Sequence, residues 1–157
     1  MARKDVSMTI EEARAFLEAG RNLQVATLGS DGYPHLTTVW YVIAEDRITF
    51  RSFSRSQRIV NLRRDPRLTV LVEEGNSYDT LRGVMVKGRA RLIDDRPTVL
   101  ETYGRIAAKY EGGGGSAALD PETLELLFGR YAGKNTAVMV ELEEVVSWDH
   151  RKLRGAY

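Results

Sequence analysis

The apolar residues of this chain first recur every third or fourth position and then every second position, which predicts a short helix followed by strands. Thr9 followed by Glu12 is typical of a capping box, so we expect a helix that begins here and ends near Gly20. Runs of β-branched and aromatic residues joined by short polar turns follow at 23–29, 35–44 and 48–53. Such short turns between strand formers indicate antiparallel hairpins.

A helical period interrupts the strands at 55–64, where Ile59 and Leu62 would face inward and Ser54 or Ser56 is suited to cap the helix. Pro66 is expected to end it, because the residue before proline is disfavoured in a helix. Strands resume at 68–74. Residues 84–92 then alternate strictly, so we expect one packed face and one face in contact with water or a ligand.

Two amphipathic helices are predicted next, one with Pro97 in its first turn and one opened by Asp120 and Pro121. Four consecutive glycines, 112–115, lie between them. A glycine run of this kind is typical of a flexible connector, and a lid over a site is the alternative interpretation. A last strand is expected over 136–148, followed by a basic and aromatic tail.

The order of elements favours a mainly β fold, with about six antiparallel strands closing into a Greek-key or meander barrel and helices at its ends. We expect a single domain over residues 1–157. Its barrel core would comprise 22–95 and 136–148, with a helical insert at 96–131 and a tail at 149–157. A Rossmann fold is excluded, because no G-x-G-x-x-G follows a strand.

Composition narrows the possible classes of protein. The chain has 157 residues with 23 basic and 22 acidic side chains and no cysteine. Disulfides, thiol nucleophiles and thiolate metal sites are therefore excluded. The N-terminus has no apolar signal-peptide region, and no apolar run approaches the ~20 residues of a membrane span. We expect a cytoplasmic protein that neither spans a membrane nor binds nucleic acid.

Few familiar catalytic patterns occur. There is no G-x-S-x-G, P-loop or H-E-x-x-H motif, and His35 and His150 lack the spacing of metal ligands, so no metal site is predicted. The adjacent carboxylates at 94–95 and 143–144 make poor acid–base pairs, since neighbouring strand residues face opposite ways. No catalytic side chain can be assigned from the sequence.

The stretch from Arg51 to Arg67 holds six arginines against one acid, Asp65. Ser56, Gln57 and Arg58 would occupy the start of the helix, where free N–H groups and the helix dipole favour an anion and arginine adds bidentate donors. A phosphate site is one interpretation of this pattern. Arginines on a solvated helix surface are the other.

A third interpretation of the same stretch is a single-strand nucleic-acid platform, in which Phe53, Trp40 and Tyr41 stack on bases. Because the total charge is balanced and no basic and aromatic spacing recurs, this interpretation is the least favoured.

Three segments together carry a family resemblance: "ATLGSDGYPHLTTVWYV", "ITFRSFSRSQRIVNLRRDPRLTVLVE" and "LRGVMVKGRARLIDD". In this order they resemble the pyridoxamine 5′-phosphate oxidase-like split-barrel family, and most closely its branch of flavin and deazaflavin oxidoreductases that use coenzyme F420. The most specific element is N-L-x-x-D-P-R, which begins at Asn61.

This resemblance implies a six-stranded split β-barrel of the FMN-binding type that forms a homodimer with cofactor sites at the subunit interface. In that family the residue matching Arg58 holds the cofactor phosphate with help from its helical neighbours, and a preceding strand lies along the ring system. The cofactor-binding residues implied in this way are Thr38, Val39, Trp40, Arg51, Ser52, Phe53, Ser56, Gln57 and Arg58.

Two departures from the oxidase pattern shift the expected activity. The C-terminal arginine-rich motif of the true oxidase is missing, and Gly83 stands where the oxidase has a flavin-contacting glutamine. The resemblance therefore implies an F420H2-dependent reductase of a small electrophile, such as a quinone, an enone or a tetrapyrrole. An FMN-dependent oxidoreductase and a non-catalytic flavin-, deazaflavin- or haem-binding protein are the alternatives. His35, Tyr78 or solvent would deliver the proton.

Overall fold

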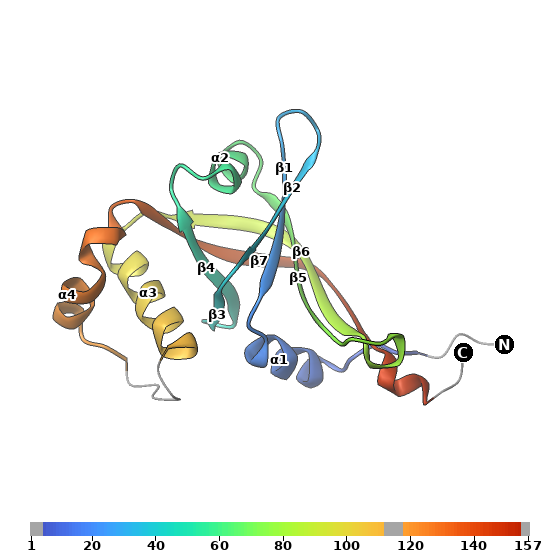
Figure 1. Ribbon diagram of the computed structural model, residues 1–157. Coiled ribbons are helices and arrows are strands. Elements are labelled where there is room, and N and C mark those ends of the chain that lie inside the picture. The colour runs from blue at the N-terminus through green and yellow to red at the C-terminus, as the bar shows by residue number, and fades with distance from the viewer. Residues whose placement is uncertain (1–4, 112–117, 155–157) are drawn as a thin grey trace.

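The structure, a computed structural model, describes residues 5–111 and 118–154 (Figure 1). Seven strands of this part form one antiparallel sheet in the order β2-β1-β5-β6-β7-β4-β3. They are β1 Leu23–Leu28, β2 Pro34–Val39, β3 Tyr41–Ala44, β4 Arg47–Phe53, β5 Arg67–Glu74, β6 Arg82–Ile93 and β7 Asn135–Asp149. The helices are α1 Ile10–Ala19, α2 Gln57–Arg64, α3 Arg96–Tyr110 and α4 Pro121–Ala132, with short 3-10 helices η1 Tyr78–Thr80 and η2 His150–Leu153.

Local capping chemistry determines where the helices begin, as predicted. The Thr9 hydroxyl accepts a hydrogen bond from the Glu12 N–H and the Glu12 carboxylate accepts one from the Thr9 N–H, so that α1 starts with a complete capping box and stops at Gly20. Asp95 and Asp120 cap α3 and α4, each with a proline in the first turn. The predicted starts of these three helices are confirmed.

The apolar run 35–44 forms two strands, and this accounts for seven strands where six were expected. β2 pairs with β1 up to Val39, whereas β3 pairs with β4 from Tyr41 onward, and these two strands form opposite edges of the sheet. Only Trp40 separates them. Since one residue advances the chain by less than 4 Å, the two edges must lie close together. The sheet therefore curls into a split β-barrel (Figure 1).

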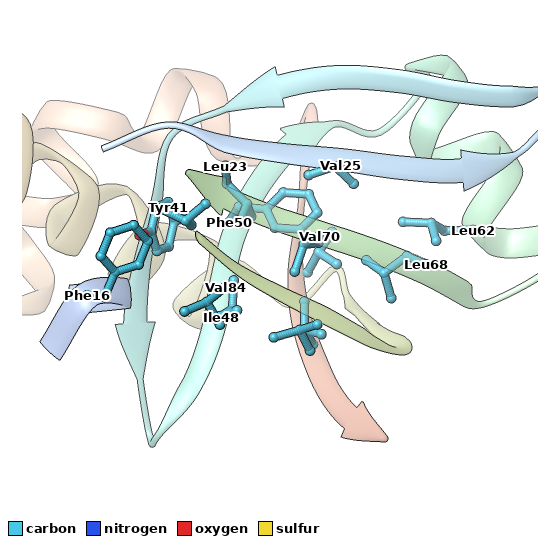
Figure 2. Packing of buried hydrophobic residues seen from close by; sticks show 14 of the residues in the cluster. Phe16, Leu23, Val25, Tyr41, Ile48, Phe50, Leu62, Leu68, Val70 and Val84 are labelled. Atoms are coloured by element: carbon cyan, nitrogen blue, oxygen red, sulfur yellow. The ribbon is translucent and has the colours of Figure 1, made fainter. Parts of the chain in front are cut away.

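The inside of the curled sheet holds the main apolar core, which α1 and α2 help to close. Figure 2 shows ten of its labelled side chains: Phe16, Leu23, Val25, Tyr41, Ile48, Phe50, Leu62, Leu68, Val70 and Val84. Full burial of an aliphatic or aromatic side chain of this size contributes about 1.5–3 kcal/mol. This core holds in place the strand ends that carry the candidate site.

The predicted alternation on β6 is confirmed. Val84 and Val86 are buried, whereas Lys87 and Arg89 are exposed on the other face. A second cluster fixes the two helices of the insert to β7: Val99, Leu100, Tyr103, Leu124, Ala132 and Ala137. As a result α3 and α4 lie side by side near the start of β7 (Figure 1).

No helix within 5–111 and 118–154 combines the length and the apolar character needed to cross a lipid bilayer. The glycine run 112–115, interpreted above as a connector or a lid, lies outside the described residues, as do the last three residues of the tail.

Candidate functional site

A cavity of about 640 Å³ lies where the ends of β2 and β4 meet α2, α3 and α4. Its volume falls within the ~300–1,000 Å³ typical of small-ligand sites. The predicted site residues that line it are Val39, Trp40, Arg51, Ser52, Phe53 and Arg58. Residues from three separate stretches of the chain are therefore brought to one concave surface.

Arg58 carries a positive charge that no described carboxylate neutralises. Its Nε donates to Thr37 Oγ1 at 3.0 Å and its Nη1 donates to Ser52 Oγ at 2.8 Å, so both partners are neutral hydroxyls. Burial lowers the pKa of the guanidinium, but arginine stays protonated at any physiological pH. The side chain is held in a fixed direction with its charge available to an anion at the cavity.

The N-terminus of α2 lies beside this arginine. Ser56 occupies the N-cap position, yet its side chain makes no capping hydrogen bond to the helix. Instead Ser56 Oγ lies 2.9 Å from Ser52 Oγ, the same hydroxyl that accepts from Arg58. The first N–H groups of α2 are left without a side-chain partner, and the helix dipole adds positive potential to the same place. This combination suits a phosphate or another oxyanion.

Three other residues implied by the resemblance do not line the cavity. Gln57 donates from its Nε2 to Asn61 Oδ1 at 2.8 Å, Ser56 reaches the cavity only through Ser52, and Thr38 is exposed on β2. On β2 it is Thr37 that faces Arg58. Cofactor contacts by Thr38, Ser56 and Gln57 remain predictions.

Arg51 is the second cation in the cavity, and it also lacks a carboxylate partner among the described residues. Its guanidinium carbon lies 3.8 Å above the ring of Tyr103, and Nη1 reaches Asn135 Oδ1 only at 3.5 Å. The Nε atom is buried with no hydrogen-bond partner. Burial raises the pKa of the Tyr103 hydroxyl, and the charge of Arg51 opposes that shift.

Aromatic rings form much of the remaining wall. Tyr103 stacks with Phe128 at 5.2 Å between ring centroids and with Tyr131 at 6.1 Å. Across the cavity, Trp40 stacks on Tyr110 at 4.4 Å with an interplanar angle of 11°. Trp40 nevertheless remains 47% exposed. The cavity thus combines flat apolar walls with cationic groups, an arrangement suited to a planar ring system bearing an anionic group.

Tyr110 anchors the strand break from which Trp40 projects. Its hydroxyl accepts from the Tyr41 N–H at 3.1 Å and donates to the Arg21 carbonyl at 2.6 Å. β3 is an edge strand, so a side chain of α3 satisfies the Tyr41 N–H on the side where no further strand of the sheet pairs. Trp40 is held from behind as one wall of the cavity.

Sequence reasoning missed the part of the wall contributed by the helical insert and by β7: Tyr103, Ile106, Ala107, Glu111, Phe128, Tyr131 and Asn135. Several of these residues belong to the apolar stripes that predicted α3 and α4. An aromatic residue at helical spacing has the same pattern whether it packs in a core or borders a cavity. The sequence therefore contained no signal that distinguished the two.

The remaining candidates lie elsewhere. Neither His35 nor Tyr78 lines the cavity, and His150 Nδ1 lies 2.7 Å from the Tyr78 carbonyl where η1 meets η2. Gly83 lies under the indole of Trp148, which an added Cβ would approach to 2.4 Å. In the part of the chain that the structure describes, no three His, Asp or Glu side chains form a group that could hold a metal ion.

Comparisons with known proteins agree with this architecture. Residues 9–149 match the family described as pyridoxamine 5′-phosphate oxidase. A conserved hypothetical protein from Mycobacterium tuberculosis, known from its crystal structure, is 33% identical with a TM-score of 0.86, and the match covers 100% of this chain and 94% of that one. No protein of curated function matches the chain.

Two more distant structures share the fold alone. An F420 reductase is 16% identical with a TM-score of 0.64, covering 87% of this chain and 98% of its own. A FAD-binding protein from Mesorhizobium loti is 17% identical with a TM-score of 0.63, covering 90% and 94% respectively.

Proposed function

Because this chain belongs to the pyridoxamine 5′-phosphate oxidase family, we propose that it is an F420H2-dependent reductase of small electrophilic molecules such as quinones, enones or tetrapyrroles. The observation that carries the proposal is Arg58, which has no carboxylate partner among the described residues and lies beside the N-terminus of α2 in a cavity lined by aromatic rings. Such a site fits a planar cofactor with a phosphate.

Different residues of the chain bind the phosphate and the ring system of the cofactor. Arg58, the hydroxyl of Ser52 and the free N–H groups of α2 bind the phosphate through charged hydrogen bonds. Trp40, backed by Tyr110, offers a flat face to the ring system. The aromatic side chains of α3 and α4 keep water away from the reacting face.

When bound, a reduced deazaflavin supplies a hydride to the acceptor, and the two-electron reduction is balanced by one further proton taken up by the product. Among the described residues, no histidine lines the cavity. Of the proton sources expected from the sequence, solvent is therefore the one favoured, and orientation of the two reactants accounts for much of the rate.

The three segments that resemble the F420-using branch support deazaflavin as the cofactor, and the surroundings of Gly83 argue against vitamin B6 oxidation without choosing between deazaflavin and FMN. The oxidase has a flavin-contacting glutamine at that position, whereas here the ring of Trp148 covers the glycine and leaves no room for a side chain. FMN remains the alternative cofactor on the same phosphate site.

Parallel titration tests the cofactor assignment. Protein stripped of ligand is titrated with F420 and with FMN while cofactor fluorescence is followed, and turnover is then measured with a neutral quinone. We expect tight F420 binding, weaker FMN binding and quinone reduction. Tight FMN binding alone would move the protein to the flavin-dependent alternative, and binding without turnover would make it a non-catalytic carrier.

A homodimer with cofactor sites at the subunit interface is the second part of the proposal. Between Glu141 and Val146 every residue of β7 is exposed, although β6 still pairs with this segment. Leu142 and Val145 are each 48% exposed and Val146 is 38% exposed. A second copy of the chain packed here would remove this apolar surface from water.

Ultracentrifugation at micromolar concentration tests the dimer. We expect wild-type protein to sediment as a dimer, and Val145→Arg to shift it towards monomer and to weaken F420 binding. Ile10→Arg is the control, because Ile10 is an exposed apolar residue on α1 outside this segment. A monomer that binds F420 tightly would contradict the shared site.

A further inference from the structure

Arg51 and Arg58 point to different parts of the cavity. Successive side chains of a strand face opposite ways, so Arg51 and Ser52 lie on opposite faces of β4. Arg58 donates to Ser52, whereas Arg51 contacts Asn135 and the ring of Tyr103. The cavity extends around the end of β4 and includes both arginines. It therefore has two separate cationic positions, and the cofactor phosphate was assigned only to that of Arg58.

The guanidinium of Arg51 is poorly satisfied within the chain. Its Nε is buried with no partner, and its Nη1 contact with Asn135 is 3.5 Å long. Tyr103 attracts the cation through its ring face and forms a side-chain hydrogen bond with Arg51, but it is a neutral group and does not balance the charge. Arg51 is half-buried, and keeping part of a charged group from water without a counter-ion costs free energy, which a bound anion would offset. This position therefore favours an anionic ligand.

The surroundings of Arg51 specify the rest of that ligand. Tyr103, Phe128 and Tyr131 present stacked rings to the cavity, which suit a flat conjugated body. Glu111, the C-cap residue of the helix that carries Tyr103, also lines the cavity, about 12 Å further along at 1.5 Å per residue. Its carboxylate would repel an anion at that end. An anionic group is thus directed towards Arg51 and the uncharged end of the ligand towards Glu111.

We propose that the part of the cavity between β4 and the α3–α4 pair is the acceptor subsite, and that Arg51 selects planar conjugated acceptors that carry a carboxylate or a comparable oxyanion. This inference rests on the proposed function, because it takes the Arg58 end to hold the cofactor. It goes beyond that function by naming the acceptor's charge and the residue that recognises it.

A binding measurement without turnover provides the test. Protein loaded with oxidised F420 is titrated calorimetrically with two oxidised quinones, 1,4-naphthoquinone-2-sulfonate and uncharged 2-methyl-1,4-naphthoquinone. No electrons move in this mixture, and the chain has no cysteine thiol to react with a quinone. We expect wild-type protein to bind the sulfonate about tenfold or more tightly than the neutral quinone. Arg51→Gln is expected to reduce that preference to about twofold or less, chiefly by weakening the binding of the sulfonate.

Two further variants keep the test decisive. Arg105→Gln removes one charge from an exposed position of α3 outside the cavity lining and should leave the preference unchanged. Arg51→Lys keeps the charge but loses the planar fork, so an intermediate preference is expected even if Arg51→Gln folds poorly. Thermal unfolding and the F420 dissociation constant are measured for each variant.

The outcomes separate this inference from the proposed function. If wild-type protein binds F420 but does not prefer the sulfonate, the acceptor inference is overturned and the proposed function stands. The inference is equally wrong if Arg51→Gln weakens the binding of both quinones to the same extent. It is also wrong if Arg51→Gln weakens F420 binding while the preference for the sulfonate persists. If wild-type protein does not bind F420 at all, both are overturned.

Discussion

Arg58 and Arg67 belong to the same arginine-rich stretch, yet their surroundings differ completely. Arg67, at the start of β5, has a guanidinium Nη2 that donates to the Asp65 carboxylate at 2.6 Å on the exposed surface. Arg58, on α2, donates only to the hydroxyls of Thr37 and Ser52. One charge is neutralised within the chain and the other faces a cavity.

Two further surface cations are paired with carboxylates, as Arg67 is. On the outer surface of β6 and β7, Lys87 pairs with Glu144 at 2.9 Å and Arg89 pairs with Glu143 at 2.8 Å. Towards the interior, the described residues offer no carboxylate to Arg51, Arg58 or Lys109. The cavity arginines thus differ from these paired surface cations in having no carboxylate partner among the described residues, and local arginine density does not reveal that difference.

The largest effect is expected on F420 binding, when a cavity arginine without a carboxylate partner is removed. Arg58→Ala should weaken F420 binding by about 1.5–3 kcal/mol, because a charged hydrogen bond to phosphate is lost. Arg67→Ala is the matched control and should change the dissociation constant by less than about twofold, since an exposed pair contributes little. Fluorescence titration measures both. Equal losses of F420 affinity in the two variants would contradict the distinction between cavity arginines and paired surface arginines.

Lys109 is a third cation without a carboxylate partner among the described residues, and the cost of leaving its charge unpaired can be tested without any ligand. Its ammonium is buried 3.9 Å from the ring centroid of Tyr41, with no hydrogen-bond partner in the described residues. Burial, reinforced by the nearby charge of Arg21, lowers the pKa of Lys109 from 10.5 to about 8. Between these two values the unfolded chain binds more protons than the folded one, so folding becomes more favourable as the pH rises from about 8 to 10.5.

Lys109→Met should therefore be more stable than wild type at pH 7, where the unfavourable burial of the ammonium is fully present. The difference should shrink as the pH is raised from about 8 towards 10.5. Urea unfolding at successive pH values measures it, and Lys134→Met, which changes an exposed lysine, is the control. If wild type is the more stable protein at pH 7, the cation–π contact with Tyr41 outweighs the cost of burial.

The smallest effect is expected at the paired cations of the surface. A double-mutant cycle on Glu101 and Arg105 of α3, whose side chains are 57% and 48% exposed and lie outside the proposed dimer surface, should give a coupling of about 0.2–1 kcal/mol. High salt should reduce this coupling further, because exposed charges are screened. Chemical denaturation with and without added salt measures it. A coupling several times larger would show that the surface pairs are structural supports in their own right.

Much of the fold could be predicted from short segments of sequence, because the rules that govern those segments are local. The capping box at Thr9 and Glu12 starts α1, and α2 ends at the residue before Pro66. The alternation over 84–92 gave the buried and exposed faces of β6 correctly. The family resemblance then implied a split barrel, which the structure contains. Arg58 lies in the cavity lining, and its contact with a cofactor phosphate stays a prediction.

Other features depend on contacts between segments far apart in the chain. Nothing in the apolar run 35–44 marks the break at Trp40, which follows from strand pairing at two opposite edges and from the hydroxyl of Tyr110. Which residues of β2 face inward likewise depends on how β2 pairs with β1, and this pairing brings Thr37 to Arg58.

The sequence by itself determined where the helices begin, where strands form apart from the break at Trp40, and that positive charge gathers around α2. Only the tertiary structure decided which of those charges are neutralised, as Arg63 is by Asp94, and which line a cavity with Tyr103 and Phe128. The physical reason is the distance over which each kind of interaction acts. Capping and side-chain periodicity act over a few residues, whereas the pairing of charges and the shape of a cavity depend on distances in space that only the folded chain defines.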